Sequence, residues 1–176
     1  MERYHLSAIR PEYYGSISSF REEIMNSGCD FEGCQKLDSY EDIEKWDLNC
    51  RLFEDPKTVP PGYSPAFQYL YLDGDEVVGM INFRPLALEH VYLKSYGGHI
   101  GYSVRPSRRN EGIGSMMLKD MLKIARDQFG SSRILITCRK DNECSKRVII
   151  KNGGVYESDI YYPPEESYLE RYWIEL

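Results

Sequence analysis

Residues Val104 to Ser115 read VRPSRRNEGIGS and join a short β-rich stretch, His99 to Val104, to a segment with apolar residues at helical spacing. An apolar strand that runs through a glycine-bearing turn into a helix aims several unpaired backbone N–H groups at one point, with the positive end of the helix dipole behind them. Such a point binds phosphate. The stretch therefore predicts a strand, a phosphate loop and a helix, in that order.

The pattern inside this loop is RxxGxG, formed by Arg109, Gly112 and Gly114. Either glycine would let a ligand approach the backbone, and a tight turn favours glycine where φ is positive. Arg109, together with Arg108, can add a guanidinium to the bound anion. The alternative is that the glycines only permit a tight strand-to-helix turn.

Two rival phosphate-binding motifs are missing from the sequence. No GxxxxGK[ST] stretch occurs, which argues against a P-loop NTPase. The three-glycine dinucleotide fingerprint is incomplete, and no acidic residue closes a following strand. The loop therefore belongs to neither of these classes.

The surrounding elements resemble a known family. A strand, RxxGxG, a helix, a strand at 133–138 and a helix opened by DNECS at 141–145 are together similar to the acetyl-CoA-binding half of the GNAT acyltransferases. The resemblance covers residues 66–176 well and the N-terminal third by general layout. HIGYSVRP (99–106), DNECSKRVIIKNGG (141–154) and RYWIEL (171–176) most resemble a bacterial subgroup described as predicted acetyltransferases.

The resemblance implies an α/β (α+β) fold of the GNAT type, with a mixed, mostly antiparallel sheet of about six to seven strands flanked by about four helices. It implies one domain over residues 1–176, which agrees with the chain length. The implied reaction transfers the acetyl group of acetyl-CoA to a primary amine in a direct ternary complex, with no metal. The alternative is a non-catalytic acyl-CoA-binding regulatory module.

By the same resemblance, the pantetheine arm pairs with the backbone of a splayed strand, and the pyrophosphate lies on the N–H groups of the loop. Asn142 would touch the arm at the start of the next helix, with Ser145 one turn on. A helix N-cap is the other interpretation of Asn142, because asparagine is among the best residues there. The predicted cofactor-binding residues are Ser103, Val104, Arg109, Asn110, Gly112, Ile113, Gly114, Ser115, Asn142 and Ser145.

Transfer from a thioester to an amine requires a base, oxyanion stabilisation and a proton for the leaving thiolate. His99 is the first candidate for the base, since it stands five residues before Val104, where related enzymes often carry a carboxylate. An imidazole with a pKa of about 6.5 accepts a proton at neutral pH. A structural histidine at the strand start is the alternative, and Glu89, Glu111 and Tyr102 are weaker candidates for the base.

One position departs from the family pattern. Many GNAT enzymes carry a tyrosine seven residues after the helix-opening asparagine, where it can protonate the thiolate, and here that residue is Ile149. Tyr156 is the nearest tyrosine in sequence and the candidate for this role, with water as the alternative. Ile149 is also the feature that favours a module without turnover.

The N-terminal third is predicted to form a strand at residues 4–9, a helix at 11–26, and a second helix opened by a capping-box-like SYED at 39–42. The proline-rich segment 55–65 is predicted to be irregular. In GNAT layouts these two helices and the following loop wall the acceptor site. Trp46, Phe53 and Tyr63 are therefore candidate substrate contacts, with core packing or loop anchoring as the alternative.

Further strands are predicted at 66–72 and 77–83, joined by Asp73-Gly74-Asp75, and at 155–160 and 167–176. By the resemblance, the last two form a hairpin that closes the sheet beside the acceptor site. This hairpin is a candidate for homodimer contacts, although aromatic strand residues ordinarily pack within a core or at an edge.

The amino-acid composition limits which classes of partner and which cellular compartment we expect. The net charge of −6 and the pI near 5.2 argue against a general nucleic-acid binder and suit a cationic acceptor, such as an amine-bearing small molecule or a peptide N-terminus. Five cysteines form no CxxC and are interpreted as reduced thiols. No apolar run approaches the roughly 18 residues of a membrane span or forms a signal-peptide core, so we expect a soluble, cytoplasmic protein without a membrane partner.

Overall fold

The computed structural model describes residues 3–176, and its first sheet uses the chain up to the predicted phosphate loop. Four strands pair antiparallel in the order β1 (Tyr4–Ser7), β2 (Phe67–Asp73), β3 (Glu76–Phe83) and β4 (Ile100–Val104). Asp73 pairs with Glu76, so Gly74 and Asp75 alone make the turn predicted from the Asp-Gly step. Strand β1 is shorter than the predicted 4–9.

The second sheet contains β5 (Arg133–Arg139), β7 (Ser167–Glu175) and β6 (Val155–Tyr162), with β7 in the middle and both pairings antiparallel. Residues 3–176 thus hold seven strands, which agrees with the predicted number. They form two antiparallel sheets rather than one continuous mixed sheet, because β4 and β5 do not pair along their lengths.

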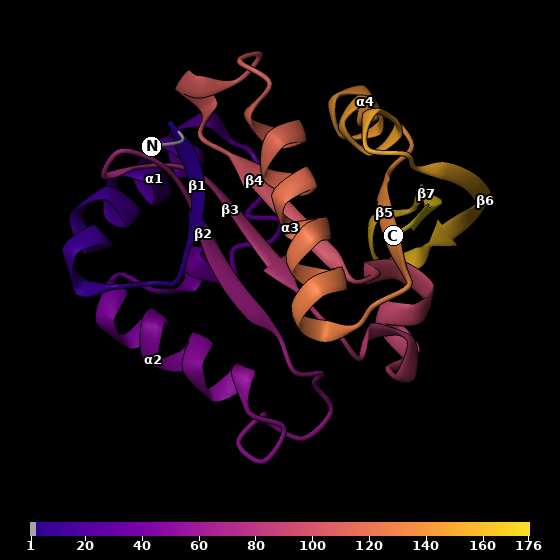
Figure 1. Cartoon of the computed structure of the whole chain (residues 1–176), viewed down its shortest axis with the longest axis horizontal. Helices are drawn as coiled ribbons and strands as arrows, with labels where there is room; N and C mark the ends of the chain where they lie inside the picture. The colour runs from indigo at the N-terminus through magenta and orange to yellow at the C-terminus, as the bar shows by residue number, and fades with distance from the viewer. Residues whose placement is uncertain (1–2) are drawn as a thin grey trace.

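Helices cover both faces of the first sheet, and one further helix lies beside the second sheet (Figure 1). On one face lie α1 (Tyr14–Ser27) and α2 (Ile43–Glu54); on the other face α3 (Ile113–Phe129) fills the angle between the two sheets, and α4 (Glu143–Lys151) packs beside β5. Short helical turns occupy η1 (Pro11–Tyr13), η2 (Leu37–Ser39), η3 (Ala87–Glu89), η4 (Leu93–Gly97), η5 (Pro106–Arg108) and η6 (Pro163–Glu165).

Two apolar cores follow from this layering. Ile17, Phe20 and Ile24, which helical spacing places on one face of α1, are fully buried against β2, β3 and α2. The larger core on the other face places α3 against both sheets, with Met117 and Met121 at its centre. Because α3 contacts strands of both sheets, it keeps them together although they share no ladder.

The second helix begins later than predicted. Its N-cap is Asp42, whose carboxylate accepts hydrogen bonds from the N–H groups of Glu44 and Lys45 at 3.0 and 3.3 Å, whereas Ser39 lies in the short turn η2. An aspartate at the N-cap satisfies the free donors of the first turn directly, so the four-residue box is not needed.

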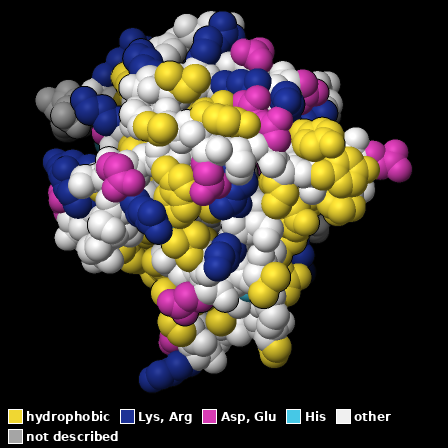
Figure 2. All heavy atoms as spheres, turned by 90° about the vertical axis from the view of Figure 1, so that its right-hand side faces the viewer, with side chains coloured by type: hydrophobic (Ala, Val, Ile, Leu, Met, Phe, Trp, Pro, Cys, Tyr) yellow, Lys and Arg dark blue, Asp and Glu magenta, His cyan; other side chains and the backbone are white. Residues whose placement is uncertain are grey.

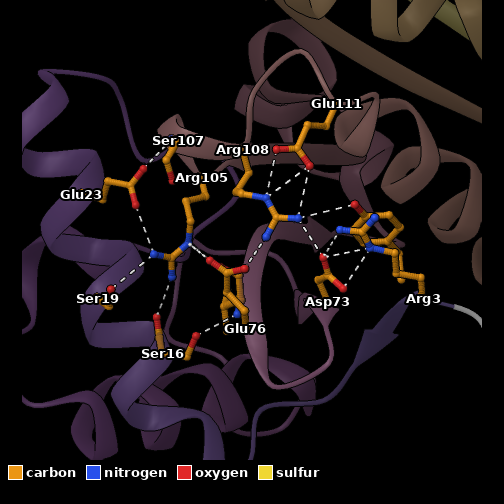
Figure 3. A network of polar contacts seen from close by, with 12 residues as sticks. Arg3, Ser16, Ser19, Glu23, Asp73, Glu76, Arg105, Ser107, Arg108 and Glu111 are labelled. Atoms are coloured by element: carbon orange, nitrogen blue, oxygen red, sulfur yellow. Dashed lines mark hydrogen bonds and ion pairs between the residues drawn. The ribbon is translucent and has the colours of Figure 1, made fainter.

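A buried arginine ties the end of β4 to α1 and to β3 (Figure 3). The Arg105 side chain is 6% exposed and donates to the Val77 carbonyl at 2.8 Å, to the Ser16 carbonyl at 3.2 Å and to the Glu23 carboxylate at 3.1 Å. Glu23 also accepts a hydrogen bond from the Ser107 N–H group. The first residues after β4 are therefore fixed to two other elements before the loop begins.

Next to it, Arg108 fixes the same segment to the β2–β3 turn. Its guanidinium contacts Asp73 at 2.8 Å, Glu111 at 3.0 Å and Glu76. Arg108 was expected to help bind an anion together with Arg109, and this expectation is wrong, because three carboxylates already surround its guanidinium. These ion pairs neutralise its charge and hold the loop in place.

Replacing Arg105 with alanine should destabilise the protein by about 3–5 kcal/mol, because it leaves the Glu23 carboxylate partly buried without its cation. The measurement is urea unfolding followed by circular dichroism. Arg126→Ala is the matched control, since Arg126 and its partner Asp127 are both solvent-exposed, and its effect on stability should be much smaller than that of Arg105→Ala. Equal losses in the two variants would contradict the anchoring role of Arg105.

Candidate functional site

The predicted phosphate loop lies between η5 and α3. Gly112 is the N-cap of α3 and has a φ of 80°, in the region that favours glycine, and Asn110 has a φ of 68°. Within residues 3–176 no acceptor is found for the N–H groups of residues 110–114, while the Ser115 N–H group bonds to the Gly112 carbonyl at 3.1 Å. The loop thus presents the free donors that the sequence predicted, centred on Gly112, Ile113 and Gly114.

The two glycines of the motif differ in backbone conformation and in the space around them. A Cβ atom on Gly112 would meet nothing within 4 Å, so backbone conformation rather than space requires glycine there. At Gly114 the φ angle is ordinary, and a Cβ atom would lie 3.4 Å from Val104 and from Val148, which is normal van der Waals contact. Packing within the protein therefore does not by itself require glycine at position 114.

Arg109 is the motif arginine that stays available. Its side chain is exposed, with Nε 3.4 Å from the Val104 carbonyl and Nη1 3.2 Å from the Cys29 sulfur. No carboxylate pairs with it in the part of the chain that the structure describes. Arg109 can therefore meet an anion bound at the loop.

The side chains of strand β4 alternate between two faces. Ser103 and Gly101 face α1 and α2, where the Ser103 hydroxyl donates to the Glu32 carbonyl at 2.7 Å, and Tyr102 and Val104 pack on the α3 side. The Arg105 N–H group bonds to β3, and alternation along the strand then turns the peptide groups of Tyr102 and Val104 away from β3, toward β5. Because β4 and β5 are the edges of their sheets, these groups face an unpaired gap.

The gap begins at His99. The His99 N–H group donates to the Leu135 carbonyl at 2.8 Å, and the Leu135 N–H group donates to Nδ1 of the His99 ring at 2.9 Å. The ring is 5% exposed, and burial lowers the pKa of His99 below its usual value. Nδ1 thus uses its lone pair internally and Nε2 of the neutral ring carries the proton. This geometry argues against His99 as the general base.

At the far side of the gap, Asn142 is the N-cap of α4. Its Oδ1 accepts from the Ser145 N–H group at 3.0 Å, which confirms the capping interpretation; a cofactor contact by the remaining amide stays a prediction. The Ser145 hydroxyl lies 2.9 Å from the Tyr102 hydroxyl, so this pair bridges β4 and α4. Burial raises the pKa of Tyr102, so its hydroxyl stays protonated at neutral pH. Ile149 is fully buried in the core.

Tyr156 is placed too far from the gap to protonate a thiolate there. It lies on β6 opposite Tyr172 of β7, which in turn lies opposite Ile136 of β5. Two strand spacings amount to about 10 Å. Its hydroxyl donates to Asp159 at 2.9 Å. Sequence proximity misled here, because β7 inserts between β5 and β6.

The three candidate acceptor residues have separate roles. Trp46 is fully buried and its indole N–H donates to the Cys34 carbonyl at 3.1 Å, so it is a core residue and not a substrate contact. Phe53 packs edge-on against Tyr63 at 5.4 Å between ring centroids, which anchors the proline-rich loop to α2. Tyr63 is 50% exposed and contacts Lys36 at 3.3 Å, so its role toward an acceptor remains a prediction.

The loop after α1 brings Glu32 to the site, a residue that sequence analysis did not single out. Gly33, with a φ of 69°, crosses β4 so closely that a Cβ atom on it would lie 2.1 Å from the Gly101 carbonyl oxygen. Glu32 as a whole residue is exposed, but desolvation of its carboxyl group by the surrounding protein raises its pKa, an effect only partly opposed by the Arg84 cation. The one sequence signal was a glycine in a loop, which does not reveal what it crosses.

Within residues 3–176, no group of three or more His, Cys, Asp or Glu side chains is arranged to hold a metal ion, and no helix is long and apolar enough to cross a membrane. Figure 2 shows the side that carries α4 and the second sheet, where charges of both signs lie between hydrophobic patches. Exposed hydrophobic side chains on β6 and β7 are Val155, Tyr156, Tyr161 and Tyr168. Homodimer formation through this hairpin remains a prediction.

Comparisons with known proteins agree with this geometry. The chain matches the acetyltransferase (GNAT) family over residues 26–153. The uncharacterized N-acetyltransferase YoaA of Bacillus subtilis (strain 168) is 31% identical over 81 residues, or 46% of this chain and 43% of that protein, so the match spans less than half of that relative's length.

Solved structures share the fold over the whole chain. RimL, a ribosomal L7/L12 alpha-N-protein acetyltransferase in complex with coenzyme A, superimposes with a TM-score of 0.73 at 19% identity, covering 100% of this chain and 96% of that chain. The microcin C7 self immunity acetyltransferase MccE, in complex with acetyl-CoA and AMP, gives a TM-score of 0.75 at 13% identity, covering 100% and 94%. These likenesses confirm the predicted GNAT fold. With the family match over residues 26–153, they show that this protein belongs to the GNAT family of acetyltransferases.

Proposed function

We propose that this protein is an acetyl-CoA-dependent N-acetyltransferase that acetylates a primary amine in a direct ternary complex. The observation that carries the proposal is the gap between β4 and β5, which begins at His99 and ends beside the free N–H groups of residues 110–114. A cofactor with amides along a flexible arm and a pyrophosphate at one end matches this succession of hydrogen-bonding groups.

The hydrogen-bonding chemistry of these residues suits acetyl-CoA, as does their order along the gap. The outward peptide groups of Tyr102 and Val104 can pair with the amides of the arm, and the N–H groups of Gly112, Ile113 and Gly114 can bind the pyrophosphate with Arg109 beside it. When bound, acetyl-CoA supplies a thioester whose carbonyl carbon accepts the amine. No metal is required for this chemistry, since the acyl group is already activated.

Glu32 is the general base in this proposal. An incoming ammonium group must lose a proton before its nitrogen can form the new bond to carbon. Glu32 lies in the loop that crosses β4, where its main-chain carbonyl accepts a hydrogen bond from the Ser103 hydroxyl. Because desolvation raises the pKa of Glu32, it is a better proton acceptor than an ordinary glutamate. Arg84, which donates to the carbonyls of Gly97 and Gly98, partly offsets the rise in the pKa of Glu32 through its positive charge.

Tyr102 supplies the proton for the leaving group. When the carbon–sulfur bond breaks, the thiolate needs a donor, and the Tyr102 hydroxyl projects from the gap-lining strand toward α4. Ser145 holds that hydroxyl at 2.9 Å and can pass a proton back from solvent afterwards. This arrangement provides an acid on β4 in a chain whose α4 carries Ile149 at the family's tyrosine position.

The acceptor class is a primary amine on a peptide N-terminus or on a small molecule. RimL carries the name of an enzyme for a protein α-amino group, while the acidic charge of this chain suits any cationic amine. Five free cysteines suit the reducing cytoplasm, where we place the protein. The second candidate function is a non-catalytic acyl-CoA-binding module, favoured by the buried Ile149 alone.

Gly112→Glu should weaken acetyl-CoA binding at least about tenfold, because it places a carboxylate on the phosphate loop and a side chain at a φ of 80°. Isothermal titration calorimetry measures this, with ADP and desulfo-CoA as reference ligands. Gly130→Glu is the matched control, since Gly130 caps the other end of α3 with a φ of 66° and equally open surroundings. Wild-type protein that binds no acyl-CoA would eliminate both candidate functions.

Glu32→Gln should lower kcat about 100-fold or more and leave acetyl-CoA affinity unchanged. A base works deprotonated, so wild-type kcat/KM should fall as pH drops through the raised pKa of Glu32, and the variant should lose that limb. Thiol release is followed with a panel of peptide and small-molecule amines. Asp30→Asn, which removes the same charge from the same loop where the side chain is 76% exposed, should retain activity.

Tyr102→Phe should lower kcat by about 10- to 100-fold without changing the Kd for acetyl-CoA, because it removes a proton donor and keeps the ring. Stopped-flow thiol release and calorimetry on the same preparations separate the two quantities. Tyr161→Phe, on the exposed part of β6, serves as the control. A variant that loses affinity but keeps kcat would assign Tyr102 a purely structural role.

A further inference from the structure

The junction between the two sheets assigns a distinct role to His99. We propose that the neutral imidazole of His99 is a positioning residue that takes the place of a main-chain acceptor for Leu135 and thereby sets where β4 and β5 separate. This inference rests on the proposed function, because the separation it sets is the gap proposed for the cofactor arm.

The argument begins with the main-chain groups of His99. Its carbonyl is turned toward the first sheet, where it accepts the Arg84 N–H group at 2.8 Å, so it is not available to β5. Its N–H group points the other way and donates to the Leu135 carbonyl at 2.8 Å. One residue therefore belongs to both sheets, one main-chain group to each.

This division leaves the Leu135 N–H group without a main-chain partner in β4. Leu135 is fully buried, and an unpaired buried N–H group costs about 1–3 kcal/mol. Nδ1 of His99 accepts that hydrogen at 2.9 Å. The ring thus satisfies the donor through a side chain, and the two strands need not continue as a ladder beyond this point.

Both strands run from the junction to a part of the proposed cofactor site. Strand β4 leads from His99 to the phosphate loop, and β5 leads from Leu135 to the N-terminus of α4. The next contact from β4 across to α4 is the hydroxyl pair of Tyr102 and Ser145. The position of the His99 ring therefore determines where the opening starts.

Neighbouring residues hold this geometry. Gly98 has a φ of 62°, and a Cβ atom on it would lie 2.5 Å from the Leu135 carbonyl oxygen, so only glycine lets the chain turn here. Arg84 donates to the carbonyls of Gly97 and Gly98 at 3.0 and 3.1 Å. The Arg84 and Arg133 cations both disfavour a second positive charge on the ring, in addition to the larger effect of burial, which lowers the pKa of His99.

The test compares two substitutions of His99. In His99→Asn the side-chain Oδ1 can stand where Nδ1 stood and accept the Leu135 N–H group, whereas His99→Leu fills similar space without an acceptor. Calorimetry with acetyl-CoA, thermal unfolding and the pH profile of kcat/KM are measured for wild type and both variants. A ring-nitrogen NMR spectrum of wild type determines the tautomer.

We expect a wild-type ring that is neutral with the proton on Nε2 at pH 7, acetyl-CoA binding by His99→Asn within about threefold of wild type, and at least about tenfold weaker binding by His99→Leu. The pH profile of the asparagine variant should match that of wild type. If His99→Leu does not fold, a stable His99→Asn variant with wild-type affinity still supports the role, since it retains only the acceptor.

Three outcomes would overturn the inference. A proton on Nδ1 would remove the acceptor, and equal affinity of the leucine variant and wild type would remove the effect on the gap. Loss of kcat in His99→Asn with unchanged affinity would restore His99 as the base. Failure of wild type itself to bind acetyl-CoA would count against the proposed function instead, and the tautomer would still report on the junction.

Discussion

The hydrogen bond from the Leu135 N–H group to the His99 ring lies at the point where two antiparallel sheets meet. A seven-stranded chain of this length would ordinarily gain stability by completing one continuous sheet, because every ladder hydrogen bond saves a buried polar group from being unpaired. Here a side chain satisfies the last donor, so the ladder can end inside the protein. The resulting gap exposes backbone groups of β4 to a ligand, and α3 keeps the sheets together by packing on both.

A second constraint acts on the loop at the other end of the gap. Free N–H groups bind an anion well only when they are already fixed, because ordering a loop on binding costs conformational entropy. Arg105 and Arg108 supply that rigidity through a network of carboxylates and carbonyls from α1, β3 and the β2–β3 turn (Figure 3). Their positive charges are neutralised within the network, so the backbone donors of the loop and Arg109 are the groups left available to an anion.

The acceptor side depends on a close backbone approach. Gly33 and Gly101 lie so near each other that neither side of the contact has room for a larger residue, which brings the loop after α1 across β4. This crossing places Glu32 beside β4, on the face where we propose that the amine is bound. A loop residue held by a rigid strand is a common way to place a catalytic group, since the loop varies while the scaffold stays constant.

Much of the architecture could be predicted from local pattern. The RxxGxG loop, the alternation of Ser103 and Val104 across β4, the Asn142 cap and the burial of Ile17, Phe20 and Ile24 all follow from turn chemistry and periodicity, which act between residues close in sequence. The start of α2 was predicted too early because Ser39 and Asp42 are both good caps, and only packing selects between them.

The chemistry of the site was decided by contacts between distant residues. The sequence suggested His99 as a base, but its Nδ1 lone pair accepts a hydrogen bond from the Leu135 N–H group, thirty-six residues away. It also suggested Arg108 as an anion ligand, but the Arg108 guanidinium pairs with Asp73, thirty-five residues away. Tyr156 is near in sequence and two strands away in space, while Glu32 and Tyr102 reach the site from different elements. The sequence by itself determined the elements and the phosphate loop, because these depend on local backbone preferences. Which side chains remain free to react was decided only by the tertiary structure, because hydrogen bonds between distant residues form only when strands and loops pack together.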